Sequence, residues 1–569
     1  MRLIVEEYLK ELKERDELEG VVAGLMSAMG LVVLTEPTRG GRQHGVDLAV
    51  VGRMPDGEVE KLYLFSIKRG NIDRSNWDSG TKQDLRPSIN EITSVYVKTG
   101  IPPEHKGKPI VVCICCGGKV DEKVWPDIQV YLNDEKERLD AKGIEFEQWN
   151  GCKLSDLICK YFCSESVLVD ADQRLLKRSL AMVDEPEVSI RNFMALVRAI
   201  MKAGEDDKTR GRTFSVKQLN LCLGLLGHFC EGAKNLEAVL QSLEMCLPLL
   251  WNYLGLKDIT GRSGKEMIRA FLTTWGLYVR YESAFLEKVS PLSKRSFFFT
   301  CACGANDEVD VNLQIFRTMG RVSSFGLGMY YMERWLIQNA EGVDDLQKAY
   351  GEIREKCAKT LMGLVNGNPT AHGPLLDGQS IDISATMLLL VYCGYAEFIK
   401  DYIHAILRRV ATNLVIGRGF PVLELTYARM LDHVHEAHNS EYKKEVLPSS
   451  ELIPQLALIA GVLKDEDCYE AVCGVWKNHL PHANLQMWFP GKETEASFFS
   501  GQQNFGNQLV SIDITDKTAF LKSVKDESQQ GMLPSTSFGA MAGLTFVCCV
   551  TRRIPIPPQY WLAIVDAMK

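Results

Sequence analysis

Between residues 45 and 68, two apolar runs rich in β-branched and aromatic residues flank a Pro-Asp-Gly turn at residues 55–57. This composition predicts two antiparallel strands joined by a short loop. With the turn as the centre of the hairpin, Asp47 lies almost opposite Ser66. Because side chains alternate along a strand, Lys68 shares a face with both. The hairpin therefore places a carboxylate beside an amine at its open end.

A carboxylate and an amine in this arrangement suit hydrolysis of a phosphodiester. Asp47 can hold Mg²⁺, while Lys68 can orient the attacking water and offset the charge that develops on the phosphate. An acid and a lysine on adjacent strands also form ordinary surface ion pairs that contribute little. Lys68, however, ends an almost wholly apolar strand, where an ammonium without a partner is costly. The pattern therefore favours a functional site over a surface pair.

The order of elements around the hairpin resembles the PD-(D/E)xK nuclease superfamily, and within it the Mrr-type restriction endonuclease domain. The resemblance covers roughly residues 15–165. Its parts are a helix at 18–26, a strand at 30–34, the Gly-x-Asp element at 45–47, the lysine element at 66–69, and two further strands at 108–115 and 144–149. It extends no further along the chain.

The resemblance implies an N-terminal α/β restriction-endonuclease-like domain that cleaves DNA with Mg²⁺ or Mn²⁺. By this comparison the catalytic residues are Asp47, Lys68 and Glu19, the last on the first helix. The implied metal ligands are Asp47, the backbone carbonyl of Ile67, and Glu19. A bacterial or archaeal restriction or anti-phage defence system is the implied setting, and RNA remains an alternative substrate because the metal chemistry does not select the sugar.

The chain departs from the family pattern at Ser66, where the superfamily usually has Glu, Asp or Gln. A serine hydroxyl is a poorer Mg²⁺ ligand than a carboxylate. Glu19 can supply the missing acid, since its place in the first helix matches the Mrr-type glutamate. Glu91, in a helix expected over residues 87–98, is the alternative. If neither acid reaches the metal, the domain is a catalytically inactive nucleic-acid-binding or scaffold protein that retains the nuclease fold.

Residues next to the hairpin are candidates for contact with the substrate phosphate. They are His44, Ser66 and Arg69. Beyond them, Arg74 and Trp77 could clamp a phosphate backbone or stack on a base, or belong to a packed loop. The formal net charge of -8 argues against a protein that coats nucleic acid through its overall field. A nuclease needs only a local basic surface, which the segment between residues 39 and 108 offers.

With 569 residues the chain is too long for a single core. We expect the nuclease-like domain over 1–168, an α-helical domain over 169–417 and a C-terminal α-helical domain over 418–569. Apolar spacings of three and four residues support the helices, including helices over 381–410 and 421–438. This helical region is expected to gate the nuclease through homo-oligomerisation, a companion defence protein or phage-derived nucleic acid.

Other motifs are weaker. The Gly-rich stretch at 261–265 lacks the spacing of a phosphate loop, and the histidines between 433 and 438 favour a partly exposed helix end over a metal site. The 17 cysteines indicate reduced core residues. The first residues turn acidic and no apolar run reaches membrane-spanning length. We therefore expect a cytoplasmic protein without a membrane partner.

Overall fold

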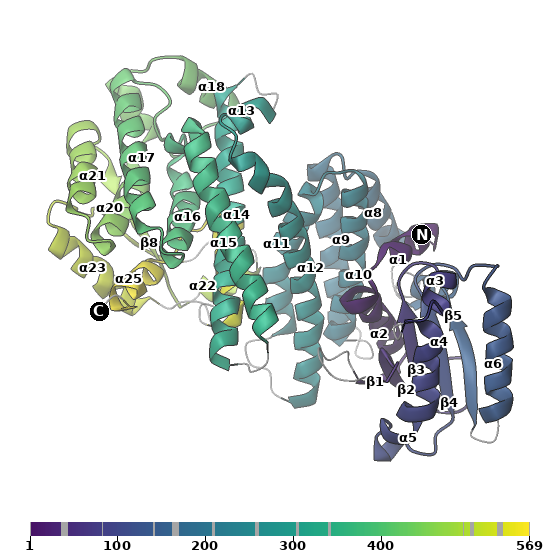
Figure 1. The fold of residues 1–569 in the computed structure, drawn as a ribbon. Coiled ribbons are helices and arrows are strands. Elements are labelled where there is room, and N and C mark those ends of the chain that lie inside the picture. The colour runs from purple at the N-terminus through teal and green to yellow at the C-terminus, as the bar shows by residue number, and fades with distance from the viewer. Residues whose placement is uncertain are drawn as a thin grey trace. The chain divides into compact units, whose positions relative to one another are not determined.

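The computed structural model describes residues 2–35, 44–81, 84–139, 143–161, 170–206, 211–255, 261–302, 307–339, 343–492, 494–500, 506–531 and 539–567. The chain divides into two compact units, residues 1–242 and 243–569. An α/β domain opens the first unit, and everything after it is mainly helical, as predicted (Figure 1). The predicted boundary after residue 168 lies outside the described residues, and the one after residue 417 falls at the end of a helix in the second unit.

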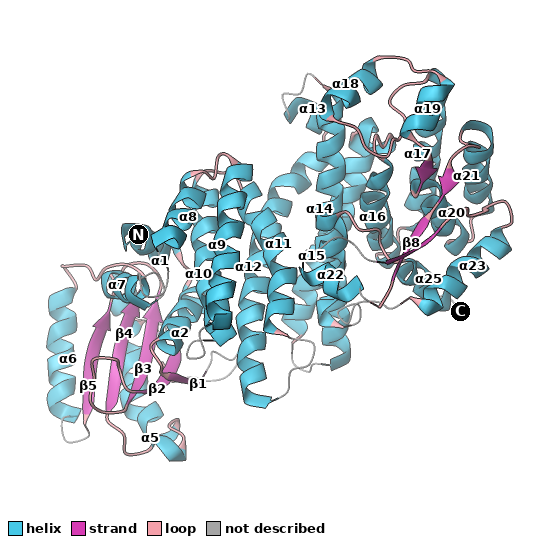
Figure 2. Cartoon of the chain, turned by 180° about the vertical axis from the view of Figure 1, so that it is seen from behind, coloured by secondary structure: helices cyan, strands magenta, loops and turns pink. Residues whose placement is uncertain are grey.

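A five-stranded mixed sheet forms the centre of the α/β domain, with the strands in chain order across the sheet (Figure 2). β1 pairs antiparallel with β2, and β2 with β3, while β3, β4 and β5 run parallel to one another. The strands are β1 (Val32–Thr35), β2 (Leu48–Gly52), β3 (Lys61–Lys68), β4 (Ile110–Cys116) and β5 (Ile144–Trp149). Strands β3 and β4 are buried on both faces, which explains their nearly continuous apolar sequence.

Helices cover both faces of this sheet. The elements around it are α1 (Arg2–Glu11), the π-helical segment η1 (Glu14–Leu18), α2 (Glu19–Ala28), α3 (Arg74–Trp77), α4 (Leu85–Glu91), the π-helical segment η2 (Ile92–Tyr96), α5 (Val97–Thr99), the 3₁₀ turn η3 (Pro103–His105), α6 (Trp125–Leu139) and α7 (Gly151–Tyr161). One core cluster joins the sheet to η2, with Leu64, Val112 and Ile92 all buried. A second joins β4 to α4 and α6 through Ile114, Ile89 and Ile128.

Three further helices follow in the first unit, α8 (Asp170–Ala181), α9 (Pro186–Asp206) and α10 (Gly211–Gly232), and the unit ends within α11 (Glu237–Leu254). α10 packs against α1 and α2 of the α/β domain. The Tyr8 ring of α1 meets the His228 ring of α10 edge to face, with centroids 6.0 Å apart. A Cβ atom on Gly224 would lie 2.2 Å from the Tyr8 hydroxyl, so glycine allows the Tyr8 side chain to pack directly on α10. The helical part of the first unit therefore contacts the α/β domain through α1 and α2.

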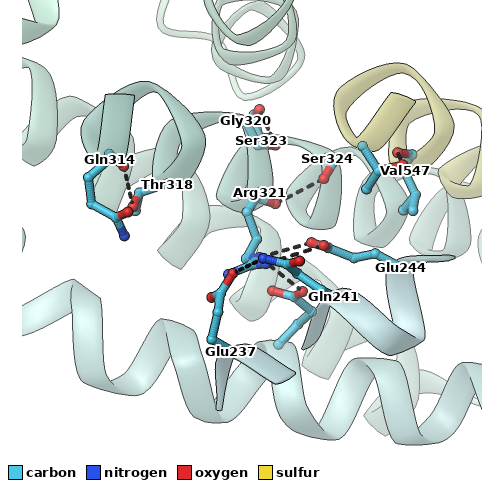
Figure 3. A network of polar contacts seen from close by, with 12 residues as sticks. Glu237, Gln241, Glu244, Gln314, Thr318, Gly320, Arg321, Ser323, Ser324 and Val547 are labelled. Atoms are coloured by element: carbon cyan, nitrogen blue, oxygen red, sulfur yellow. Dashed lines mark hydrogen bonds and ion pairs between the residues drawn. The ribbon is translucent and has the colours of Figure 1, made fainter. Parts of the chain in front are cut away.

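The second unit is built around long helices. Its helices are the last part of α11 (Glu237–Leu254), then α12 (Gly261–Ser293), α13 (Phe298–Ala302), α14 (Glu308–Asn339), α15 (Asp344–Gly367), α16 (Ser380–Tyr392), α17 (Ala396–Ile416), α18 (Tyr427–His435), α19 (Ser440–Val446), α20 (Leu452–Val462), α21 (Glu466–His479), α22 (Thr494–Ser500), α23 (Lys517–Gln530), α24 (Gly543–Arg552) and α25 (Pro558–Ala567). The 3₁₀ turns are η5 (Pro369–His372), η6 (Asp377–Gln379) and η8 (Ala540–Ala542). Helix α14 packs against α15, α16 and α24. In its middle, buried Arg321 contacts Glu244 of α11 (Figure 3).

Several sequence expectations for the second unit need correction. The helix expected over residues 381–410 is two helices, because the chain turns at Gly394, whose φ is +84°. Of the helix expected over 421–438, only α18 forms. Short strands also occur where none was predicted, β6 (Ser449–Ser450) beside β7 (Asn484–Leu485) and β8 (Met487–Pro490) beside β9 (Gly506–Leu509). Among the described residues, none of the helices has the length and apolar character of a membrane span.

Candidate functional site

The open end of the β2–β3 hairpin carries the candidate site. In the antiparallel register Leu48 lies opposite Phe65, so the next pair outward is Asp47 and Ser66. The backbone N–H of Asp47 donates to the Phe65 carbonyl over 2.9 Å, which continues the ladder one residue beyond β2. The predicted hairpin and its register are confirmed.

A left-handed turn leads the chain into Asp47. His44 has φ of +48° and Gly45 has φ of +79°, a region that favours glycine. A Cβ atom on Gly45 would lie 2.2 Å from the backbone carbonyl oxygen of Ser88 in α4. Helix α4 therefore closes directly over this turn and fixes the start of the strand. His44 itself is half-buried.

The Asp47 carboxylate is held by the neighbouring strand. Its Oδ2 atom accepts a hydrogen bond from the backbone N–H of Ile67 over 2.7 Å, and the side chain is half-buried. Since the N–H and C=O of one strand residue point to the same side, the Ile67 carbonyl faces the same edge as the carboxylate. A carboxylate and a carbonyl oxygen are hard oxygen donors of the type that Mg²⁺ takes.

Lys68 is the last residue of β3 and is 9% exposed. Its Nζ atom lies 3.2 Å from Oε1 of Glu14, whose side chain is 31% exposed. The strand backbone at Lys68 is in register with Cys116 of β4. The amine therefore projects from a fixed strand end and meets a carboxylate from the segment before α2.

Glu14 reaches Lys68 because the chain forms a π-helical turn ahead of α2. The N–H of Leu18 donates to the carbonyl of Lys13, and the N–H of Glu19 donates to that of Glu14, both with the five-residue spacing of a π-helix. Glu14 and Glu19 are thus one wide turn apart. Periodicity arguments for an ordinary α-helix do not anticipate this turn, and Glu14 was missed by sequence reasoning.

The two acids proposed from the sequence occupy different surroundings. Glu19 opens α2 and is 3% exposed, so its carboxyl group belongs to the interior of the domain. Glu91 closes α4 and is exposed. Of the helix acids in the described residues, Glu14 is the one that contacts Lys68 in an ion pair.

The residues proposed for phosphate contact also differ in accessibility. Ser66 is fully buried, and its hydroxyl has no hydrogen-bond partner among the described residues. Arg69 and Arg74 are exposed. Trp77 is 4% exposed and packs edge to face on Tyr131 of α6, with centroids 5.5 Å apart. Trp77 is therefore packed and not available for stacking on a base, but it lies at the end of helix α3 and not in a loop. Contact of Arg69 and Arg74 with phosphate stays a prediction.

Cysteines near the site fill the core. Cys115 of β4 lies beside Ile67 in the parallel register and is fully buried. Burial raises the pKa of its thiol well above the usual value, and the nearby Asp47 carboxylate raises it further. A neutral thiol packed inside a sheet is not a nucleophile. The cysteines of the described residues are free of disulfides, as predicted.

The remaining motifs do not form competing sites. Residues 261–265 lie in the first turn of α12 and not in a loop. The histidines lie at the end of α18 and are partly exposed, as expected: His435 is exposed, while His433 is buried with its Nε2 2.7 Å from the Phe420 carbonyl oxygen. Within the described ranges, no group of three or more His, Cys, Asp or Glu side chains is arranged to hold a metal ion.

The donor set at Asp47 fits Mg²⁺ without such a cluster. Mg²⁺ in phosphoryl-transfer sites usually has one or two protein carboxylates and completes its shell with substrate oxygens and water. Asp47 and the Ile67 carbonyl supply this minimum. No family model, no curated protein and no solved structure matches the chain.

Proposed function

We propose that the chain is a Mg²⁺-dependent nuclease whose substrate is DNA and whose active site is the open end of the β2–β3 hairpin. The observation that carries the proposal is the Asp47 carboxylate, held by the Ile67 N–H over 2.7 Å. Lys68 follows directly on the same strand. An acid, a carbonyl and an amine on adjacent positions of a rigid sheet are the groups that metal-assisted phosphodiester hydrolysis requires.

In this proposal Asp47 and the Ile67 carbonyl would hold Mg²⁺, which supplies Lewis-acid polarisation of the phosphate when bound. Lys68 orients the attacking water through its Nζ atom and offsets charge on the phosphate. The exposed guanidinium groups of Arg69 and Arg74 bind flanking phosphates. The site thereby divides into a buried catalytic end and an exposed binding end.

We further propose that the helical region gates this activity, as expected of an effector in a restriction or anti-phage defence system. Support comes from the first unit, where α10 packs against α1 and α2. Those two helices flank the π-helical turn that carries Glu14. A displacement of α10 can therefore be passed on to Glu14, the residue that contacts Lys68, through one intervening helix, α1 or α2.

Ser66 favours a second candidate, a nucleic-acid-binding protein without catalysis. The family position for a second strand acid holds a buried hydroxyl here, which leaves fewer carboxylates for a metal. Under this alternative the exposed arginines bind phosphate and the hairpin is only structural.

One experiment separates the two. The purified full chain is incubated with plasmid, linear DNA and RNA, with and without Mg²⁺, beside Asp47→Ala and Lys68→Ala. The nuclease proposal predicts Mg²⁺-dependent DNA cleavage that both variants lose while DNA binding persists. Metal-independent binding without cleavage of any substrate supports the second candidate, and cleavage of RNA alone would reassign the substrate.

A further inference from the structure

We infer that Glu14 is the positioning residue for Lys68, and that the π-helical turn η1 exists to place it there. This inference rests on the proposed nuclease function and deepens it. The acid that contacts the lysine is neither Glu19 nor Glu91, the two helix acids that the sequence suggests as metal ligands. The carboxylate comes from the turn before α2, where Glu14 Oε1 lies 3.2 Å from Lys68 Nζ.

The backbone around Lys68 is fixed independently of Glu14. β3 is held by β4, in register to the pair Lys68 and Cys116. The chain then turns at Gly70, whose φ is +60° and whose carbonyl accepts the Gly118 N–H over 2.8 Å. The strand does not fix the four-carbon side chain of Lys68, which has many rotamers and can carry its ammonium group to different positions. The Glu14 carboxylate removes this freedom.

The π-helical turn has its own support. The Glu17 carboxylate accepts the backbone N–H of Lys13 over 2.9 Å at the start of the turn. The two hydrogen bonds of five-residue spacing then close it. π-helical turns are rare and are frequently found at functional sites. Here the effect of the turn is to bring Glu14 over the end of β3, while Glu19 remains inside the domain.

The geometry distinguishes positioning from metal binding. Glu14 contacts the amine, while the donors toward Mg²⁺ are Asp47 and the Ile67 carbonyl. Loss of the Glu14 charge should therefore impair the orientation of Lys68 and leave the metal site in place. Misplacement of a catalytic group by about 1 Å can lower a rate about 100-fold.

The test compares Glu14→Gln, Glu14→Asp and Asp47→Asn with wild type in the full chain. Glu11→Gln is the matched control, since Glu11 is an exposed acid at the end of α1. Three quantities are measured: Mg²⁺ affinity by calorimetry, kcat and KM for DNA cleavage, and the rate at which an amine-acylating reagent modifies Lys68, followed by mass spectrometry.

For Glu14→Gln we expect Mg²⁺ affinity within about 2-fold of wild type, kcat lower by roughly 10- to 100-fold with little change in KM, and faster acylation of Lys68. Glu14→Asp should recover part of kcat, and Asp47→Asn should lose Mg²⁺ binding. If Glu14→Gln changes neither kcat nor the acylation rate of Lys68, this inference is overturned and the proposed function is not. A loss of Mg²⁺ binding equal to that of Asp47→Asn would also overturn it, by making Glu14 a ligand. Wild-type protein that cleaves nothing would overturn the proposed function and this inference together.

Discussion

The α/β domain and the helical second unit each contain an ion pair of low exposure, and the two pairs are built differently. Lys68 meets Glu14 through one contact of 3.2 Å, with side chains 11% and 31% exposed. Arg321 meets Glu244 through two contacts, 2.8 Å from Nε and 3.2 Å from Nη2, and both side chains are 8% exposed or less (Figure 3). Glu282 adds a second carboxylate 3.8 Å from Nε of Arg321.

Under the proposed function, this difference separates a charge that stabilises the fold, Arg321, from a charge that takes part in a reaction, Lys68. A bidentate arginine pair inside a helix bundle has fixed geometry and no access to solvent, so its role is to satisfy buried groups. A lysine with a single contact at a strand end, beside a partly exposed acid, can accept a phosphate or a water as a further partner. We therefore expect replacement of the cation by methionine to lower activity in the Lys68–Glu14 pair and to lower stability in the Arg321–Glu244 pair.

The largest expected effect is the loss of DNA cleavage in the Lys68→Met variant. Methionine keeps most of the apolar stem and removes the amine, so DNA cleavage should fall by about 100- to 10,000-fold. The free energy of unfolding should change by only about 1 kcal/mol, because the pair is single and Glu14 stays partly solvated. Cleavage rates and urea unfolding on the same preparation check both statements. A loss of activity that merely follows a loss of fold would contradict them.

Arg321→Met should show the reverse pattern. Two buried carboxylates lose their cation, which is expected to cost about 3–5 kcal/mol of the stability of the second unit. Arg408→Met is the matched control, since Arg408 is exposed on α17, and it should leave unfolding unchanged. Chemical unfolding followed by tryptophan fluorescence measures the difference. Equal stability in the two variants would show that the buried pair is not structural.

Gly224→Ala tests whether the helical part of the first unit influences the site. The new Cβ atom would lie 2.2 Å from the Tyr8 hydroxyl, so the Tyr8 side chain, α1 or α10 must shift, at a cost of about 1–3 kcal/mol. Because α1 leads into the turn carrying Glu14, we expect the cleavage rate to change as well. Gly232→Ala, in the same helix with open space around it, should change neither quantity. A Gly224→Ala protein with altered stability and wild-type cleavage would argue against gating through α1.

The smallest effect concerns Glu451 beside buried Asp377 in the second unit. Burial, aided by the Asp377 charge, raises the pKa of Glu451 from 4.5 to about 7. The stabilising contribution of its neutral form is complete below pH 4.5 and is lost as the pH rises through 7. Relative to Glu451→Gln, wild type should lose about 1–3 °C of Tm between pH 4.5 and 8. A difference in Tm that does not vary with pH would contradict this pKa.

Sequence patterns predicted the parts of the fold that depend on regular periodicity. The hairpin register, and with it the place of Asp47 opposite Ser66, follows from alternation and a turn. The π-helical turn does not, since its spacing suits neither strand nor α-helix, and Glu14 therefore escaped notice. Trp77 was a candidate for base stacking because sequence patterns do not reveal its contact with Tyr131, which lies 54 positions further along the chain. The β8–β9 pair was also missed, since two four-residue strands give little periodic signal.

The central claim is that Asp47 organises a metal-dependent active site, and the Mg²⁺ dependence of plasmid cleavage tests it most directly. Wild-type and Asp47→Asn full chains are titrated with Mg²⁺ in parallel, with thermal unfolding recorded to confirm equal folding. We predict saturable cleavage by the wild type that chelation abolishes, and a loss of at least about 100-fold in Asp47→Asn. Equal cleavage by the two proteins, or cleavage that persists after chelation, would contradict the account.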